Sequence, residues 1–250
     1  MQLAAVAVIA FISEYLDSGL GMGYGTALAP ILILMGYSPL SVVPAILVSQ
    51  LITDIAACVT HHQLNNVDFR PGTADRKVAT ALGLICAVGV IISVVVAVRI
   101  PKWVLTLYIG VLVAAMGVLI LATANKQIPF SWKKVLGLGL LASFNKGISG
   151  GGYGPVVMGG QMLSGIGVKN AVGITALAEA ITCLVGFLCY LFAGKYIDWK
   201  LTGILILAAT PAVPFAAATV KNLDPVRMKR YVGVMIVLLG LLTLTKLGGG

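Results

Sequence analysis

The sequence predicts an all-α polytopic membrane protein, and three observations support this prediction. Of the 250 residues, 59% are hydrophobic and only 10% are charged, and the mean hydropathy is +1.04. A soluble globular domain carries about a quarter charged residues. The apolar residues gather into long runs separated by short polar loops, and two matching glycine-rich segments interrupt these runs.

Each apolar run is expected to form a helix. The runs lie at about 3–18, 24–36, 39–61, 78–99, 103–122, 135–146, 153–165, 168–193, 201–220 and 230–245. A spanning helix needs about 20 residues, so the runs at 24–36 and 153–165 are too short to cross alone. Each should form a half-depth hairpin with the run before it. The first run lacks a basic n-region and a cleavage pattern, so we interpret it as a retained helix.

Prolines within these runs are expected to bend the helices. Pro44 should kink the third run, and Pro211 and Pro214 should kink the ninth. Proline removes a backbone donor and its ring clashes with the preceding turn.

The two halves of the chain repeat. A shift of 129 residues places Gly23-Tyr24-Gly25 on Gly152-Tyr153-Gly154, and a shift of 123 places Tyr108 on Tyr231. We therefore divide the chain into an N-terminal membrane repeat, 1–125, and a C-terminal membrane repeat, 126–250. Each should hold one glycine-rich broken or re-entrant helix pair and three spanning helices.

The basic loops predict the orientation of the two halves. Arg70–Lys77 and Lys126–Lys134 hold three basic residues each, and Lys221–Arg230 holds four. Basic loops tend to remain in the cytoplasm. Placing all three loops there requires an odd number of crossings in each half. The repeats are then inverted with respect to each other, and both termini lie outside.

Composition argues against several other classes of protein. The net charge of +9 comes mostly from loops, where basic residues set topology, so no nucleic-acid partner is expected. The pair His61-His62 lacks a cysteine or carboxylate to complete a ligand set, so neither a metal site nor a cofactor is predicted. No nucleophile elbow, Walker loop or HExxH motif occurs, which argues against an enzyme. Four cysteines without a CxxC pair should pack in the core: Cys58, Cys86, Cys183 and Cys189.

Two glycine-rich segments are the strongest functional signal. Phe144–Pro155 contains a lysine, an asparagine and five glycines between apolar runs, and Asp17–Thr26 is its counterpart. Glycine and proline should open the backbone there. Open backbone at membrane depth is tolerated only where it is buried in protein or lines a wet cavity. Two breaks at matching places indicate the binding site of a transporter.

The helix starts after these breaks predict an anion site near the bilayer midplane. A helix beginning after Gly23 or Gly152 presents unpaired N–H groups and the positive end of its dipole. Lys146 and Asn145 would add a charge and a donor. The predicted substrate contacts are Gly23, Tyr24, Gly25, Thr26, Gln50, Asn145, Lys146, Gly152, Tyr153 and Gly154. Close helix packing is the alternative for the glycines, and aromatic packing is the alternative for the tyrosines.

Acidic residues inside the apolar runs suggest coupling to protons. Glu14, Asp17, Asp54 and Glu179 lie in such runs. Each charge there costs about 3 kcal/mol, so these side chains should face a polar cavity or a partner. Burial favours the neutral form of a carboxyl. The candidates for proton coupling are therefore Glu179, Asp54 and Glu14, although pairing with Lys146 is an alternative for Asp54.

The glycine motifs resemble those of a known family. Gly21-Met22-Gly23-Tyr24-Gly25-Thr26, then Pro30 and Gly36, together with Gly147–Pro155, resemble the TauE/SafE family of sulfite and organosulfonate exporters. It is also called the 4-toluene sulfonate uptake permease family. The resemblance covers nearly the whole chain. It implies a multi-pass transporter of the prokaryotic cytoplasmic membrane that moves sulfite, thiosulfate or a sulfonate by secondary transport, with proton coupling as an option. The roles of Gln50, Lys146 and Glu179 come from their positions and not from the resemblance.

Several functions remain open at this point. The first is a secondary transporter, most simply an exporter, of a small sulfur-containing anion. A channel or facilitator for an anion or a small solute would use the same helix starts without ion coupling. A membrane subunit that scaffolds a partner would tolerate changes at Lys146. A cation transporter would suit four acidic side chains around one internal lysine. The sequence leaves the substrate, the direction of transport, the coupling ion and the oligomeric state open.

Overall fold

The computed structural model describes residues 2–123, 131–162, 166–220 and 225–245, and every regular element in these ranges is a helix. The helices are α1 (Gln2–Leu20), α2 (Tyr24–Leu34), α3 (Pro39–Gln63), α4 (Ala74–Ala97), α5 (Lys102–Thr123), α6 (Trp132–Ser149), α7 (Tyr153–Met162), α8 (Val168–Phe192), α9 (Trp199–Ala209), α10 (Ala212–Thr219) and α11 (Pro225–Thr245). The predicted all-α class is confirmed.

Five stretches within the described ranges are long and apolar enough to span a membrane. They are Leu3–Leu20, Pro39–Gln63, Ala74–Ala97, Lys169–Phe192 and Trp199–Thr219. Large apolar side chains lie exposed on these helices, among them Leu84, Phe192 and Leu207. Lipid, unlike water, favours such a surface. The chain is therefore a multi-pass membrane protein.

The predicted breaks occur at the glycine-rich segments. One separates α1 from α2, and the other separates α6 from α7. Matched glycines in the two breaks have positive φ angles: Gly21 64° and Gly150 75°, Gly23 134° and Gly152 76°. Other residues rarely adopt such angles, which explains glycine at these four positions.

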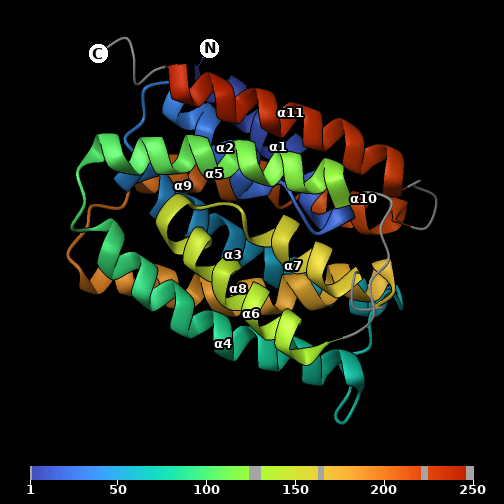
Figure 1. Cartoon of the computed structure of the whole chain (residues 1–250). Helices are drawn as coiled ribbons and strands as arrows, with labels where there is room; N and C mark the ends of the chain where they lie inside the picture. Colours follow the sequence, from blue (N-terminus) through green and yellow to red (C-terminus); the bar gives the residue numbers. More distant parts are fainter. Residues whose placement is uncertain (1, 124–130, 163–165, 221–224, 246–250) are drawn as a thin grey trace.

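The broken helices lie in the middle of the molecule. Helices α5 and α11 pack side by side across one side, while α4 packs against α6 and α8 across the opposite side (Figure 1). The short helices α2 and α7 lie between these two layers, and α3 packs against α8 and α9. The two interruptions between helices are thereby surrounded by protein, as open backbone in a membrane requires.

The helix bounds of the two halves correspond, with one difference. Helices α3 and α8 are 25 residues each and begin at Pro39 and Val168, the predicted 129 residues apart. Helix α4 is continuous, whereas the ninth run divides into α9 and α10 beside Pro211, as predicted. Pro44 lies inside α3, which continues past it as a single helix. Lys126, Lys221 and Lys246 lie outside the described residues, and the inverted arrangement stays a prediction.

Candidate functional site

Lys146 is a fully buried cation at the end of α6. Only 1% of it is exposed. Its Nζ lies 2.7 Å from Oε1 of Glu179 on α8 and also donates to Oε1 of Gln50 on α3. Buried charges are retained where they are paired and hydrogen-bonded. The structure thus pairs Lys146 with Glu179, and not with Asp54, which was the alternative from the sequence.

Gln50 connects the ion pair to the first half of the chain. Its Nε2 donates to Oε1 of Glu179 at 2.8 Å and to Oδ2 of Asp17 at 3.1 Å. One amide side chain therefore joins α1, α3, α6 and α8 at a single buried cluster. We call Asp17, Gln50, Lys146 and Glu179 the central cluster.

One N–H group at each of the two helix starts is already bonded to a side chain. At the start of α2, Oδ1 of Asp17 accepts a hydrogen bond from the N–H of Tyr24 at 3.2 Å. Before α7, Oγ1 of Thr26 accepts from the N–H of Gly152 at 2.8 Å. A carboxylate at a helix N-terminus is stabilised by the helix dipole. An anion that binds the N–H groups of Tyr24 and Gly152 must displace these side chains.

Backbone contact fills the space between the two breaks. A Cβ on Gly25 would overlap the carbonyl oxygen of Gly150, and a Cβ on Gly154 would lie 2.5 Å from the carbonyl oxygen of Gly21. Real Cβ atoms do not approach other atoms so closely. Gly25 and Gly154 therefore allow close packing in this conformation, which was the alternative considered for the glycines.

Three other predicted contact residues bond to partners outside the central cluster. The hydroxyl of Tyr24 bonds with Ser49, and that of Tyr153 donates to Sγ of Cys86 at 3.5 Å. The hydroxyl of Tyr108 on α5 donates to Oδ1 of Asn145 at 2.6 Å. The bond of Tyr24 joins α2 to α3, and the other two hold the segments on either side of Lys146 against α4 and α5.

The remaining carboxyls lie beside the central cluster. Oε1 of Glu14 accepts from the hydroxyl of Ser18 at 2.6 Å. Its Oε2 and Oδ2 of Asp54 are buried and have no hydrogen-bond partner among the described residues. A small cavity of about 10 Å³ adjoins Asp54, lined by Asp17, Ser18, Gly21, Asp54, Ala57, Val172, Thr175, Ala176 and Glu179. That volume suits about one water molecule. The site is closed in this conformation.

From the sequence, neither Asp17 nor Thr175 was assigned a role in substrate binding or proton coupling. Asp17 lies at the centre because it binds both Gln50 and the start of α2. Thr175 lies one helical turn before Glu179, and this i, i+4 spacing was the available signal. Cys183, predicted to pack, has its Sγ grouped with carboxylate oxygens of Asp54 and Glu179, all within 4.8 Å of one another. These three could hold an ion, so the prediction that no metal binds is untested.

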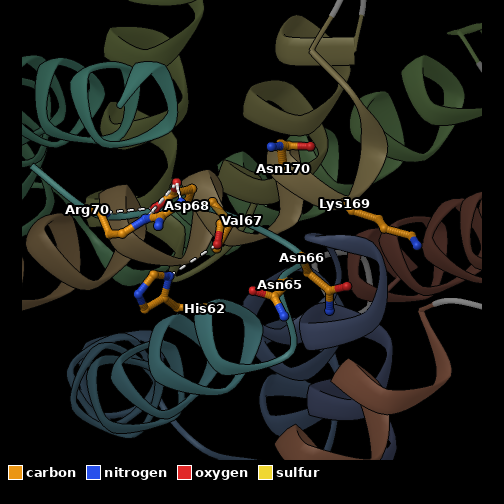
Figure 2. Close-up of a pocket in the computed structure, with 8 residues that line it drawn as sticks. All are labelled: His62, Asn65, Asn66, Val67, Asp68, Arg70, Lys169 and Asn170. Carbon is orange, nitrogen blue, oxygen red and sulfur yellow. Dashed lines mark hydrogen bonds and ion pairs between the residues drawn. The ribbon is translucent and has the colours of Figure 1, made fainter. Parts of the chain in front are cut away.

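A larger hollow of about 340 Å³ opens where α3 ends and α8 begins (Figure 2). It is lined by His62, Asn65, Asn66, Val67, Asp68, Arg70, Lys169 and Asn170. Nη2 of Arg70 lies 2.6 Å from Oδ2 of Asp68, and hydrogen bonds from Arg70 lower the pKa of Asp68 to about 2. Helices α3 and α8 also line the small cavity, through Asp54 and Glu179.

A chain of buried hydrogen bonds joins Asn66, which lines the hollow, to Ser18, which lines the cavity. Nε2 of His61 donates to the carbonyl of Ser18 at 2.9 Å. Its Nδ1 therefore accepts from Nδ2 of Asn66, 3.1 Å away. Asn66 also donates to the carbonyl of Ala217 at 3.3 Å. These bonds link the end of α3 to α1 and α10.

These features define a class of protein. Broken helices that meet around a buried polar site inside a bundle of spanning helices are typical of secondary transporters. The family described as "Sulfite exporter TauE/SafE" matches residues 6–243. The chain belongs to this family of membrane transporters, which are not enzymes, and the predicted resemblance is confirmed.

A bacterial relative supports the same class. The chain is 26% identical to "Probable membrane transporter protein YtnM" of Bacillus subtilis (strain 168) over 256 residues. The aligned region covers 97% of this chain and 83% of the relative. The similarity therefore extends over both halves and both glycine-rich breaks.

Proposed function

We propose that the protein is a secondary transporter that exports a small sulfur-containing anion, such as sulfite, thiosulfate or an organosulfonate, across a prokaryotic cytoplasmic membrane. Family membership supports the class of substrate. The observation that carries the proposal is the buried Lys146, which lies at the end of a broken helix and is held by Glu179 and Gln50. An ionisable residue inside a membrane is by default part of a functional site.

In this proposal the anion replaces Glu179 as the partner of Lys146. An anion beside the ionised carboxylates of Glu179 and Asp17 would be repelled. Uptake of a proton by Glu179 removes one negative charge and releases the lysine. Binding of the anion and binding of a proton therefore support each other, which is the basis of coupled transport. Asp54 and Glu14 are further proton acceptors beside the same cluster.

The anion requires an opening that this conformation lacks. The cavity of about 10 Å³ is too small for sulfite, so the structure corresponds to an occluded state. We assign the hollow in Figure 2 as the mouth of the route and the His61–Asn66 pair as its closed gate. Lys169 and Arg70 at the mouth would attract anions over a distance.

Flux into proteoliposomes tests the proposal. We expect uptake of labelled thiosulfate driven by a pH gradient, and loss of this uptake in Lys146→Gln/Glu179→Gln, which keeps the site uncharged and paired. Flux that does not depend on the pH gradient would instead indicate a channel or facilitator without coupling. Absence of flux for every sulfur-containing anion would reject the proposed function.

A further inference from the structure

Among the carboxyls that line the small cavity, Asp54 is the one for which the described residues leave a buried oxygen without a hydrogen-bond partner. It is 2% exposed, and its Oδ2 lacks a hydrogen-bond partner within the described ranges. The neighbouring carboxyls differ, because Glu179 pairs with Lys146, and Asp17 accepts from Gln50 and from the start of α2. An ionised carboxylate buried without a partner is strongly unfavourable. Asp54 therefore needs either a proton or a bound cation.

Oxygen atoms around one small cavity supply the setting for a cation. The carboxyls of Asp17, Asp54 and Glu179 line this cavity, together with Ser18 and Gly21 from the end of α1. The C-terminal end of a helix carries about half a negative charge. In membrane transporters, the C-terminal ends of broken helices coordinate sodium ions or protons.

The size and charge of the cavity favour one monovalent cation. A cavity of about 10 Å³ admits about one water molecule, and a dehydrated sodium ion is of similar size. Magnesium usually keeps several of its waters, and calcium takes six to eight oxygen ligands, so neither suits this space. Among the three carboxyls that line the cavity, Lys146 neutralises Glu179 and the start of α2 stabilises Asp17, so the uncompensated negative charge in the lining is that of Asp54.

Cys183 offers a competing arrangement. Its Sγ lies with carboxylate oxygens of Asp54 and Glu179, all within 4.8 Å of one another. A thiolate with two carboxylates would suit a softer divalent metal such as zinc. The ammonium group of Lys146, 2.7 Å from Glu179, opposes a second positive charge of that size. Sodium is therefore the cation that the site favours.

We propose that the cavity binds one sodium ion, coordinated by Asp54 with oxygen atoms of Asp17 and Glu179, and that protons compete with sodium for Asp54. The proposal deepens the proposed function by naming a second coupling ion, and its link to transport rests on that function. The binding itself does not require an anion.

Thermal unfolding of the purified full-length protein tests the site without any sulfur-containing anion. A ligand that binds only the folded state raises Tm. At alkaline pH we expect NaCl to raise Tm in a saturable way, relative to KCl and choline chloride. Each tenfold increase above the Kd should add roughly 3–6 °C. The effect should shrink as the pH falls, because protons then occupy Asp54.

Two substitutions make this test specific. Asp54→Asn removes the uncompensated charge and retains the shape, so it should fold with an equal or higher Tm in choline chloride and lose the response to sodium. The matched control Asp68→Asn alters an acid on the exposed loop and should keep the full response. Binding of radioactive sodium to both variants provides a second readout.

Three results would overturn the sodium site. One is an equal Tm in sodium and choline chloride at alkaline pH. Another is a Tm that changes with pH but not with sodium, which would indicate that Asp54 binds a proton and no sodium ion. The third is stabilisation by zinc that Cys183→Ser abolishes. Anion binding measured separately in sodium-free buffer shows whether the proposed function survives, so the two failures are distinguishable.

Discussion

Lys146 and Glu179 form an ion pair across α6 and α8, with Nζ and Oε1 2.7 Å apart and side chains 1% and 3% exposed. Both residues belong to the second half of the chain. Gln50 and Asp17 from the first half complete the cluster around them. The site consequently exists only where the two halves of the chain meet.

Removing one partner of the ion pair should destabilise the protein much more than removing both partners. Lys146→Gln leaves the Glu179 carboxylate buried without its cation and is expected to destabilise the protein by about 3–5 kcal/mol. The double variant Lys146→Gln/Glu179→Gln removes both charges and should recover most of this loss. Unfolding of the purified variants by heat or denaturant measures both changes. A double variant as unstable as the single one would show that the pairing does not set the stability.

The close contact between Gly25 and the carbonyl of Gly150 should not tolerate a side chain at position 25. Gly25→Ala places a methyl group on the carbonyl of Gly150, so the backbone must shift and Tm should fall. Gly203→Ala is the matched control, because a Cβ at this helical position meets no atom within 4 Å. We expect it to keep the wild-type Tm and flux. Equal behaviour of the two variants would contradict the close approach.

Anion affinity should increase as the pH falls. A proton on Glu179 releases Lys146 for the anion, so each bound anion takes up one proton. The affinity should then change by up to about tenfold per pH unit while Glu179 is ionised in the free protein. Thiosulfate suits this measurement because its own charge stays constant near neutral pH. Glu179→Gln removes the carboxylate that competes with the anion for Lys146, so we expect tighter binding with a weaker dependence on pH.

The His61–Asn66 pair should control access from the hollow. Asn66→Ala removes the donor that holds His61, whose ring is fully buried. Ala57→Cys places a thiol in the wall of the small cavity. The same protein should carry Cys58→Ala, which removes the neighbouring native thiol. We expect Asn66→Ala to speed labelling of this thiol by a membrane-impermeant reagent. The control Asn65→Gly, which suits the positive φ of 57° at this exposed residue of the hollow, should leave the rate unchanged, and equal rates in both variants would reject the gate.

Local features of the sequence were sufficient to predict the helices and the two breaks. Hydropathy determines which segments can lie in a membrane, and glycine is favoured where φ is positive, as at Gly23 and Gly152. Pro211 likewise marks the point where α9 ends and a short new helix begins. These effects depend on neighbours in the chain and need no tertiary information.

The partners inside the site depended on packing and were harder to predict. Sequence spacing did not distinguish Glu179 from Asp54 as the partner of Lys146, because the choice depends on how α3 and α8 pack against α6. Asp17 was identified as a buried acid, but its bond to the start of α2 follows from the fold of the break. The contact of Gly25 with Gly150 likewise needs both halves in place.

Binding of thiosulfate and sulfite to the purified protein, measured by calorimetry with chloride as the comparison, tests the central role of Lys146 most directly. The wild type and Glu179→Gln should bind the sulfur-containing anions, and Lys146→Gln/Glu179→Gln should remain folded and bind neither. Unchanged affinity in that folded double variant would contradict the account, because the anion would then be held without the buried lysine.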